Sequence, residues 1–470
     1  MARILLAKAR FTTFDQYTVV PPLGLMYLAA ALRRAGHQVR IYEAGVRWRD
    51  LDRFRDALAA FHPAVVGLSA ITTEAEVMAR MAVTARATLP GVPILVGGPH
   101  ATAYPEWCLR HPAIDYAILG EAEHSVPALL EALLRGQRPE GLAGIASRSS
   151  TGELVVGPPP RLIRDLDELA FPAWDLIDID LYARHRSMSA MGHRRYMPLV
   201  TSRGCPYHCI YCHQVHGKRF RARSPLNVVA EMDELHRRHG IHDFEVIDDI
   251  FNLEKERTQE ILERVAALPW RATLSFPNAL RADLLDDLQI DWLRRAGTVY
   301  LSLAVETATP RLQRLIRKNL RLEGVPQVIE SAVGRGIFVN GFFMLGFPTE
   351  TLEEAQATVD FAVRSRLHEA LFFIVTPFSG TELGRMTGAP VPHERVPESF
   401  QDFDYYQGTA NISAMSDEAL YGLQREAYRR FYADPRRVLR ILWCHPRRWE
   451  LLPDGMRALG RMLPRRRGNG

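Results

Sequence analysis

Short apolar runs alternate with helical patterns through the first third of the chain. The apolar runs are RILLAKA, QVRIYEA, AVVGLSA, PILVGGPHA and YAILGE, and amphipathic stretches such as LGLMYLAAALRRAG and DLDRFRDALAAF separate them. Runs that are apolar throughout are typical of parallel strands covered on both faces. The pattern therefore predicts an α/β fold that begins with an open, doubly wound parallel sheet over residues 1–140.

Small and hydroxyl residues gather in the loops that follow these strands. A doubly wound sheet binds its ligand beyond the carboxyl ends of its strands, so these loops predict a binding edge for a bulky ligand. The residues expected there are Pro22 and Gly24 in the loop FTTFDQYTVVPPLG, Ser69 and Thr72 after the third strand, Gly97, Gly98 and His100 after the fourth, and Gly120 and Glu121 after the fifth.

A second series of strands follows a segment rich in Pro, Gly and Asp. That segment, residues 141–195, predicts a short ribbon and a linker. Six strand patterns then recur with room for a helix after each, namely MPLVTSR, DFEVID, TLSFP, VYLSLAV, FVNGFFML and LFFIVT. They predict an incomplete (βα)6 barrel over residues 196–400, with its active site at the carboxyl ends of the strands. Residues 401–470 read as a helical region with a basic tail.

The net charge of +5 belongs to the tail. Residues 435–470 hold ten Arg against Glu450 and Asp454, a local charge of +8, so the first 434 residues carry −3. We therefore expect no nucleic-acid binding by the body of the protein. Apolar and basic residues at helical spacing in the tail fit an anionic membrane surface, and a lid helix with a solvated basic face fits them equally.

No apolar run is long enough to cross a membrane, and the N-terminus lacks the features of a secretory signal. We expect a cytoplasmic protein, with a peripheral position at the inner face of the membrane as an alternative. Five cysteines, three of them crowded into eight positions, do not predict a disulfide framework.

The crowded cysteines are Cys205, Cys209 and Cys212, spaced CxxxCxxC directly after a strand. Three thiolates suit an iron-sulfur cluster, and a 4Fe-4S cluster held by three cysteines leaves one iron open to another ligand. Structural zinc is the alternative, completed by one of the nearby residues His208, His213 and His216. Zinc is disfavoured because no second CxxC lies elsewhere in the chain.

These residues resemble a known family. RGCPYHCIYC is similar to the cluster motif of radical S-adenosylmethionine (SAM) enzymes, and GFPTET and TPFSGTEL resemble later segments of that family. PPLGLMYLAAALRRAGH, VGLSAITTE, VGGPHAT and ILGEAEHSV resemble the cobalamin-binding domain of one of its branches. The resemblance implies three cofactors: a 4Fe-4S cluster, SAM and cobalamin.

The resemblance also implies roles for single residues. Cys205, Cys209 and Cys212 would hold the cluster, with SAM on its open iron, and Tyr211 would pack near the adenine. Gly346 would let the backbone approach the nucleoside, although a plain turn explains it nearly as well.

Acidic residues at strand ends would contact the rest of SAM. Asp248 and Asp249 would contact the methionyl amine, with a solvated turn as the alternative. Glu306 ends an apolar strand, where a carboxylate is costly unless paired. It would contact the ribose or the methionyl group, or form an ion pair with Arg281, which we count among the cofactor-binding residues.

The implied activity is methyl transfer to an unactivated carbon through a 5′-deoxyadenosyl radical and methylcobalamin. A non-methylating cyclase, oxidase or rearrangement enzyme with the same cofactors is one alternative, and a corrinoid-binding regulatory protein with structural zinc is another. The implied partners are an external electron donor such as flavodoxin or ferredoxin and a small-molecule, lipid or tetrapyrrole substrate. A methylthiotransferase would carry a second cysteine triad, but the N-terminal domain has only Cys108.

The cobalamin-binding segment departs from one pattern. No DxHxxG motif is present, so the cobalt would not be ligated by the His of that motif. His100 is a candidate lower ligand of cobalt, and a hydrogen-bonding loop residue is the alternative.

Overall fold

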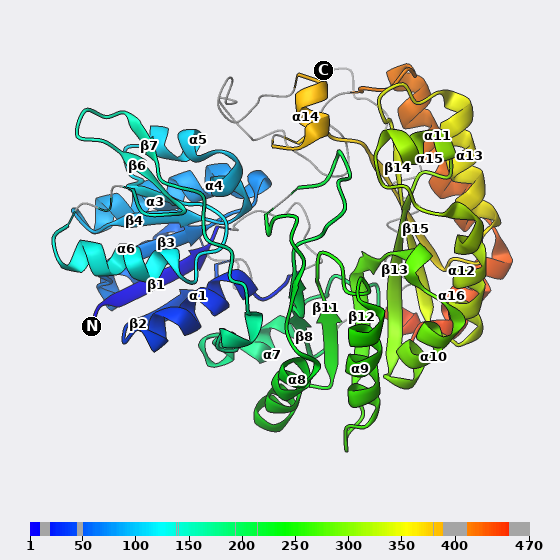
Figure 1. Ribbon diagram of the computed structural model, residues 1–470, viewed down its shortest axis with the longest axis horizontal. Coiled ribbons are helices and arrows are strands. Elements are labelled where there is room, and N and C mark those ends of the chain that lie inside the picture. The colour runs from blue at the N-terminus through cyan, green and yellow to red at the C-terminus, as the bar shows by residue number, and fades with distance from the viewer. Residues whose placement is uncertain are drawn as a thin grey trace.

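A seven-stranded sheet forms the N-terminal part of the chain (Figure 1). The computed structural model describes residues 1–9, 19–44, 50–137, 139, 141–192, 194–213, 215–378, 380–388 and 411–450. Five strands run parallel, as predicted, and two antiparallel strands extend the sheet in the order β2-β1-β3-β4-β5-β6-β7. The strands are β1 (Arg3–Lys8), β2 (Gln38–Tyr42), β3 (Val65–Ser69), β4 (Ile94–Gly97), β5 (Tyr116–Ile118), β6 (Ile145–Arg148) and β7 (Leu154–Val156).

Helices cover both faces of this sheet, which confirms the doubly wound fold. Leu28 of α1 packs with Leu129 of α6 on one face. Phe54 of α2 and Met78 of α3 pack on the other. The helices are α1 (Leu23–Arg34), α2 (Leu51–Phe61), α3 (Ala75–Thr88), α4 (Pro99–Ala103), α5 (Pro105–Arg110) and α6 (Ser125–Leu134).

The ribbon expected within residues 141–195 belongs to this sheet. β6 pairs antiparallel with β5, and β7 pairs with β6, so the sheet continues to Val156 rather than ending near residue 140. Ile145 and Ala146 are buried and give β6 a core-facing side. Strands of three and four residues are too short for their periodicity to reveal which sheet they join.

An open six-stranded parallel sheet follows, in the order β15-β14-β13-β12-β11-β8. Its edge strands β8 and β15 do not pair with each other, which confirms the incomplete barrel. The strands are β8 (Tyr196–Leu199), β11 (Asp243–Val246), β12 (Thr273–Leu280), β13 (Thr298–Glu306), β14 (Phe338–Leu345) and β15 (Glu369–Ile374). Helices lie outside the strands (Figure 1): α8 (Pro225–His239), α9 (Lys255–Ala266), α10 (Asp287–Arg295), α11 (Pro310–Leu315), α12 (Val325–Gly334) and α13 (Leu352–Arg364).

Local sequence sets the limits of these helices, as α8 illustrates. The Ser224 side chain accepts a hydrogen bond from the backbone N–H of Asn227, and Pro225 occupies the first turn. Gly240 ends the helix in the left-handed region, with φ of 62°. The remaining helices are α7 (Ile179–Tyr182), α14 (Glu382–Met386), α15 (Asp417–Tyr432) and α16 (Pro435–Cys444).

The helix α1 of the N-terminal domain contributes to the hydrophobic core of the barrel. Met26 and Tyr27 of α1 lie in the same buried cluster as Met197 and Leu199 of β8. Trp174 of the linker lies in that cluster and donates a hydrogen bond from Nε1 to the buried Glu231 of α8. The N-terminal domain is thus packed directly against the first barrel strand (Figure 1).

Two predicted features lie outside the described residues: residues 10–18 of the loop after the first strand, and the end of the basic tail from residue 451. Among the helices that the structure describes, none has the length and apolar character needed to cross a membrane.

Candidate functional site

The cysteine loop leaves β8 and is closed at its base by a two-stranded ribbon. β9 (Ser202–Arg203) pairs antiparallel with β10 (Arg221–Ala222), so the chain between them forms a closed loop. Gly204 opens this loop with φ of 83°, and a Cβ at this position would lie 2.3 Å from the backbone oxygen of Arg219. Only glycine fits there.

All three cysteines of this loop are free thiols, and each is half-buried. Their loop is anchored to the barrel because Ile210 N–H donates to the backbone oxygen of Ile316 at 3.1 Å. Burial raises the pKa of the Cys205 thiol, and burial with the nearby Cys209 raises that of Cys212 to about 12. Metal loading of this loop must therefore release protons.

Asp248 and Asp249, directly after β11, hold the first residues of the loop. The buried Asp248 accepts hydrogen bonds from the Thr201 N–H at 2.6 Å and from the hydroxyls of Thr201 and Ser202 at 2.5 and 2.6 Å. Asp249 is exposed and accepts a hydrogen bond from the Gly204 N–H at 2.9 Å. Both oxygens of the Asp248 carboxylate thus accept hydrogen bonds from the protein. Asp249 accepts one such bond and is exposed to solvent.

Glu306 ends β13 with φ of 66° and is buried, as expected for a paired carboxylate. Its Oε1 accepts hydrogen bonds from the Tyr211 hydroxyl at 3.1 Å and from Lys318 Nζ at 3.0 Å. Burial and the Glu306 charge raise the pKa of Tyr211 well above its ordinary value, so the hydroxyl remains a donor. The structure therefore joins the aromatic residue of the cysteine motif to the end of β13.

The expected alternative, an ion pair between Glu306 and Arg281, is wrong. Arg281 pairs with Asp283 at 2.8 Å, donates to the backbone oxygen of Lys318 at 2.8 Å, and lies 3.9 Å from the centre of the Tyr207 ring. Lys318 takes the place beside Glu306. Arg281 thus braces the cysteine loop through Tyr207 and supports the segment that presents Lys318.

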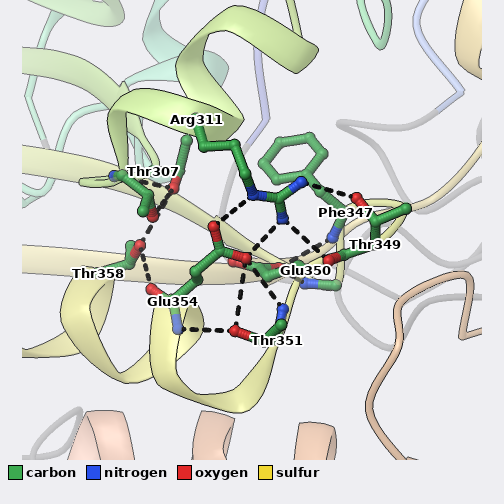
Figure 2. A network of polar contacts seen from close by, with 10 residues as sticks. Thr307, Arg311, Phe347, Thr349, Glu350, Thr351, Glu354 and Thr358 are labelled. Carbon is green, nitrogen blue, oxygen red and sulfur yellow. Dashed lines mark hydrogen bonds and ion pairs between the residues drawn. The ribbon is translucent and has the colours of Figure 1, made fainter.

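The segment GFPTET after β14 is held from both sides (Figure 2). On the inside, the fully buried Glu350 accepts hydrogen bonds from the N–H groups of Gly346 at 2.5 Å and Phe347 at 2.9 Å. On the outside, Arg311 donates to Glu354 and to the backbone oxygen of Thr349 at 2.9 Å. Thr349 has φ of 62°, a conformation that needs such support in a β-branched residue.

Gly346 itself has φ of 99°, and a Cβ there would lie 3.2 Å from Leu420 of α15. The glycine is therefore required by its backbone conformation and by the C-terminal helix. Its expected contact with the nucleoside stays a prediction.

We predict a pH effect from Glu350, whose pKa burial raises to about 7. The folded protein then holds a proton that the unfolded chain releases between about pH 4.5 and 7, so stability falls as the pH rises through this window. Glu350→Gln keeps the acceptor oxygen and should remove up to about 3 kcal/mol of this loss. Urea unfolding at pH 5 and pH 8 measures the difference. Glu353→Gln, at an exposed position nearby, is the control, and identical pH slopes in wild type and Glu350→Gln would contradict the prediction.

The expected binding edge of the N-terminal sheet is assembled at the adjacent ends of β3 and β4. Ser69 and Gly97 are register partners, and Gly98 follows with φ of 88°. A Cβ on Gly98 would lie 2.7 Å from Ser69 Oγ and 2.9 Å from the backbone oxygen of Ala70. Thr72 starts the helical turn that follows β3. The strand ends can therefore approach each other only because Gly98 lacks a side chain.

At the start of α1, Pro22 precedes the helix and Gly24 lies in its first turn. A Cβ at Gly24 would meet nothing within 4 Å. The Gly24 side of the helix is therefore open where the sequence predicts a bulky ligand.

We predict that Gly98→Ala destabilises the N-terminal domain. Its φ of 88° and ψ of −173° are reached almost only by glycine, and the clash with Ser69 adds to that strain. The free energy of unfolding should fall by about 3 kcal/mol or more. Gly36→Ala is the matched control, because Gly36 has φ of 84° but open space around it, and should cost only about 1–2 kcal/mol. Equal losses in both variants would contradict the close contact at Gly98.

The His100 backbone lies at this edge, where its N–H donates to the Ala70 oxygen at 3.2 Å, but its side chain is not open to a ligand. It is fully buried, its ring centre is 5.3 Å from that of Tyr104 and 4.9 Å from that of Trp107, and burial lowers its pKa to about 3. The imidazole is therefore neutral and enclosed by protein side chains. The structure favours the alternative of a packed His100 over a lower ligand of cobalt.

After β5, Gly120 lies against Pro160 of the segment that precedes the barrel, and Glu121 contacts the barrel. A Cβ at Gly120 would lie 2.9 Å from Pro160. Glu121 forms a two-point ion pair with Arg221, at 2.6 and 3.0 Å, and Glu123 pairs with Arg203 at 2.5 Å. Arg203 and Arg221 are register partners in the ribbon that closes the cysteine loop.

These buried pairs, which we call the ribbon clamp (Glu121, Glu123, Arg203, Arg221), join the two predicted binding edges. Glu121 also accepts the Ile163 N–H at 2.9 Å, and its Oε1 lies 3.8 Å from His216 Nδ1. Burial alone would raise the pKa of Glu121, but His216, Arg221, the Arg203 charge and the Ile163 N–H together hold it well below its usual range. The clamp thus fixes the carboxyl end of β5 against the base of the cysteine loop.

Sequence reasoning missed Lys318, Glu350 and the arginines of the clamp. Lys318 carried one usable signal, because only four of the 59 basic residues in the chain are lysines. Arg221 carried none, because arginine is the common cation of this chain, and Arg203 was marked only by its place at the start of RGCPYHCIYC.

Comparisons with known proteins agree with this arrangement. The family model described as B12 binding domain matches residues 11–130, and the model described as Radical SAM superfamily matches residues 199–362. A cytidylyl-2-hydroxyethylphosphonate methyltransferase of Streptomyces wedmorensis is 30% identical over 451 residues, covering 84% of this chain and 83% of that protein. An uncharacterized methyltransferase of Pyrococcus horikoshii is 29% identical over 431 residues, covering 91% of each chain.

The fold also matches a solved structure. The radical SAM methyltransferase TsrM from Kitasatospora setae, with cobalamin and a 4Fe-4S cluster bound, superposes with a TM-score of 0.67 at 21% identity, over 82% of this chain and 74% of that one.

The chain therefore belongs to the radical SAM superfamily, in the branch that carries a B12-binding domain. It is a radical SAM enzyme, and its cofactors are a 4Fe-4S cluster, SAM and cobalamin. The residues fit this set, since three thiols share one loop and the Gly24 side of α1 is open where the bulky cobalamin is expected. Among the described residues, no three His, Cys, Asp or Glu side chains lie close enough to hold a single metal ion. A cubane cluster instead takes one thiolate per iron atom.

Proposed function

We propose that the protein transfers a methyl group to an unactivated carbon, or to another poorly nucleophilic centre, of a small molecule. The observation that carries this proposal is the ribbon clamp, which holds the carboxyl end of a B12-domain strand against the cysteine loop through Glu121 and Arg221. A methyl donor and a radical source need this proximity if both are to reach one substrate. The 30% identical phosphonate methyltransferase supports the same reaction class.

When bound, the cluster with SAM supplies a 5′-deoxyadenosyl radical and the cobalamin supplies a methyl group. Cys205, Cys209 and Cys212 hold the cluster in this proposal. Asp249, which is exposed beside Gly204, contacts the methionyl amine, while Asp248 positions the loop from below.

On the other side of the loop, Tyr211 packs near the adenine. Its hydroxyl is oriented by Glu306, and Lys318 balances the Glu306 charge. This pairing lets a carboxylate sit at the site without the cost of a buried lone charge.

We propose a small-molecule substrate of the phosphonate, lipid or tetrapyrrole class. Reduction of the cluster requires an electron from outside, and flavodoxin or ferredoxin is the donor class we propose.

Product analysis tests the proposal. Anaerobic protein with cofactors, reductant and 2-hydroxyethylphosphonate cytidylyl ester as the first candidate substrate should form S-adenosylhomocysteine together with 5′-deoxyadenosine. Substrate turnover with 5′-deoxyadenosine alone would contradict methylation and favour a non-methylating radical reaction. If protein with a full cluster formed neither product with any tested substrate class, the proposed chemistry would be contradicted.

A further inference from the structure

An apolar row beside arginines is exposed on α16 and the turn after it. Leu439, Trp443 and Trp449 expose 67%, 82% and 78% of their surfaces. Arg436, Arg447 and Arg448 of the same segment are also exposed, and Arg447 pairs with Glu450 at 3.2 Å. We call the three apolar residues and the three arginines the α16 face. Leu134 at the end of α6 is also exposed, and a single exposed apolar residue of this kind is ordinary for a protein surface.

Contacts on the buried side of α16 hold the helix so that its other side faces solvent. Ile441 packs beside Met191, Tyr300 and Phe338. The buried Arg437 donates to the backbone oxygens of Val363 and Ser365 at 2.7 and 2.8 Å, and its guanidinium lies 3.6 Å from the centre of the Phe431 ring. The exposure of Leu439 and Trp443 is thus a consequence of a well-anchored helix.

The α16 face lies at the end of the barrel opposite the cysteine loop. Tyr300 and Phe338, against which α16 packs, stand at the beginnings of β13 and β14, whereas the cysteine loop follows the end of β8. Because the strands are parallel, their beginnings lie at one end of the barrel and their carboxyl ends at the other (Figure 1). The alternative considered from the sequence, a lid helix over the active site, is therefore wrong for α16.

Charge restricts what can cover the face. Residues 435–450 hold five Arg against Glu450, and residues 451–470 add five Arg against Asp454. The tail and a second copy of this face carry the same sign as the face itself, so neither complements it. The complementary partner is anionic, and exposed tryptophans beside arginines are typical of residues at a lipid headgroup interface.

We propose that the α16 face binds an anionic lipid surface and holds the enzyme peripherally, with its cofactor site directed away from the membrane. This inference is independent of the proposed methyl transfer. It implies that the substrate reaches the site from the aqueous side.

Vesicle sedimentation of the full chain tests the proposal. Binding to vesicles of phosphatidylcholine mixed with phosphatidylglycerol should be at least about tenfold tighter than to phosphatidylcholine alone, and should weaken as salt is added. The double substitution Leu439→Glu and Trp443→Glu should lower binding to the mixed vesicles at least about tenfold. Leu134→Glu, on the N-terminal domain, is the matched control and should bind as the wild type does. Unfolding midpoints of all variants confirm that the fold is retained.

Other outcomes would overturn the proposal. Equal binding to both vesicle types would show that the arginines do not contribute to binding. Unchanged binding by the double variant would assign any membrane affinity to the tail. A dimer in sedimentation velocity that the double variant dissociates would make the face a contact between copies. Binding to polyglutamate but not to mixed vesicles would indicate an acidic protein partner.

Discussion

Replacing Cys209 by Ala should abolish 5′-deoxyadenosine formation. Three thiolates are the protein ligands that the chain offers to the cluster, so loss of one leaves an iron without a protein ligand. Even residues that only support metal ligands change activity 10–100-fold, so the expected loss is larger than about a hundredfold. Mass-spectrometric measurement of 5′-deoxyadenosine, with the iron content of the same sample, checks this result.

Cys444→Ala is the control for Cys209→Ala. Cys444 is half-buried on α16, remote from the cysteine loop, and its replacement should leave both iron content and product formation unchanged. Retention of 5′-deoxyadenosine formation by Cys209→Ala would contradict the assignment of the loop as cluster ligand.

Breaking the ribbon clamp should lower the free energy of unfolding more than breaking any other ion pair considered above. Arg221→Met leaves the Glu121 carboxylate buried without its two-point partner, and loss of one member of a buried pair costs about 3–5 kcal/mol. Urea unfolding should show this loss. Arg33→Met is the matched control, because Arg33 pairs with Asp175 on the surface and should contribute at most about 1 kcal/mol.

A second substitution separates the charge effect from lost packing. Glu121→Leu in the Arg221→Met background should recover part of the stability, because the uncompensated charge is then removed. A loss in Arg221→Met no larger than that in Arg33→Met would show that the clamp is not a buried pair in solution. A double variant less stable than Arg221→Met would show that the Glu121 charge is not the cause of the loss.

Most strands of the fold could be predicted from the sequence. Runs such as the one that became β14 are apolar at nearly every position because helices and barrel interior cover both faces of a parallel sheet. The ribbon of β6 and β7 could be predicted, but its place in the N-terminal sheet could not, because tertiary contacts choose the pairing partner and short strands carry no mark of their neighbour.

The candidate site was predictable to the extent that it follows strand ends. The cysteine spacing, the acids after β11 and Glu306 all lie where the sequence placed them. The partner of each carboxylate was not predictable, because Arg281 and Lys318 could both pair with Glu306 and the geometry of the loops determines which of them does. Lys318 reaches Glu306, whereas Arg281 turns to Asp283 and Tyr207.

Glu121 shows the same limit at the other domain. Its position after β5 indicates the ligand edge of the N-terminal sheet, yet its partners Arg203 and Arg221 belong to the barrel. A pattern confined to one domain cannot reveal that its loop is used to join another.

The most direct test of the cofactor assignment is the content of cobalt, iron and sulfide in protein made anaerobically with corrinoid supplied. We expect about one cobalt and about four iron and four sulfide per chain. Zinc in place of iron and sulfide would contradict the cluster, and four irons without cobalt would contradict cobalamin binding and with it the proposed route of methyl transfer.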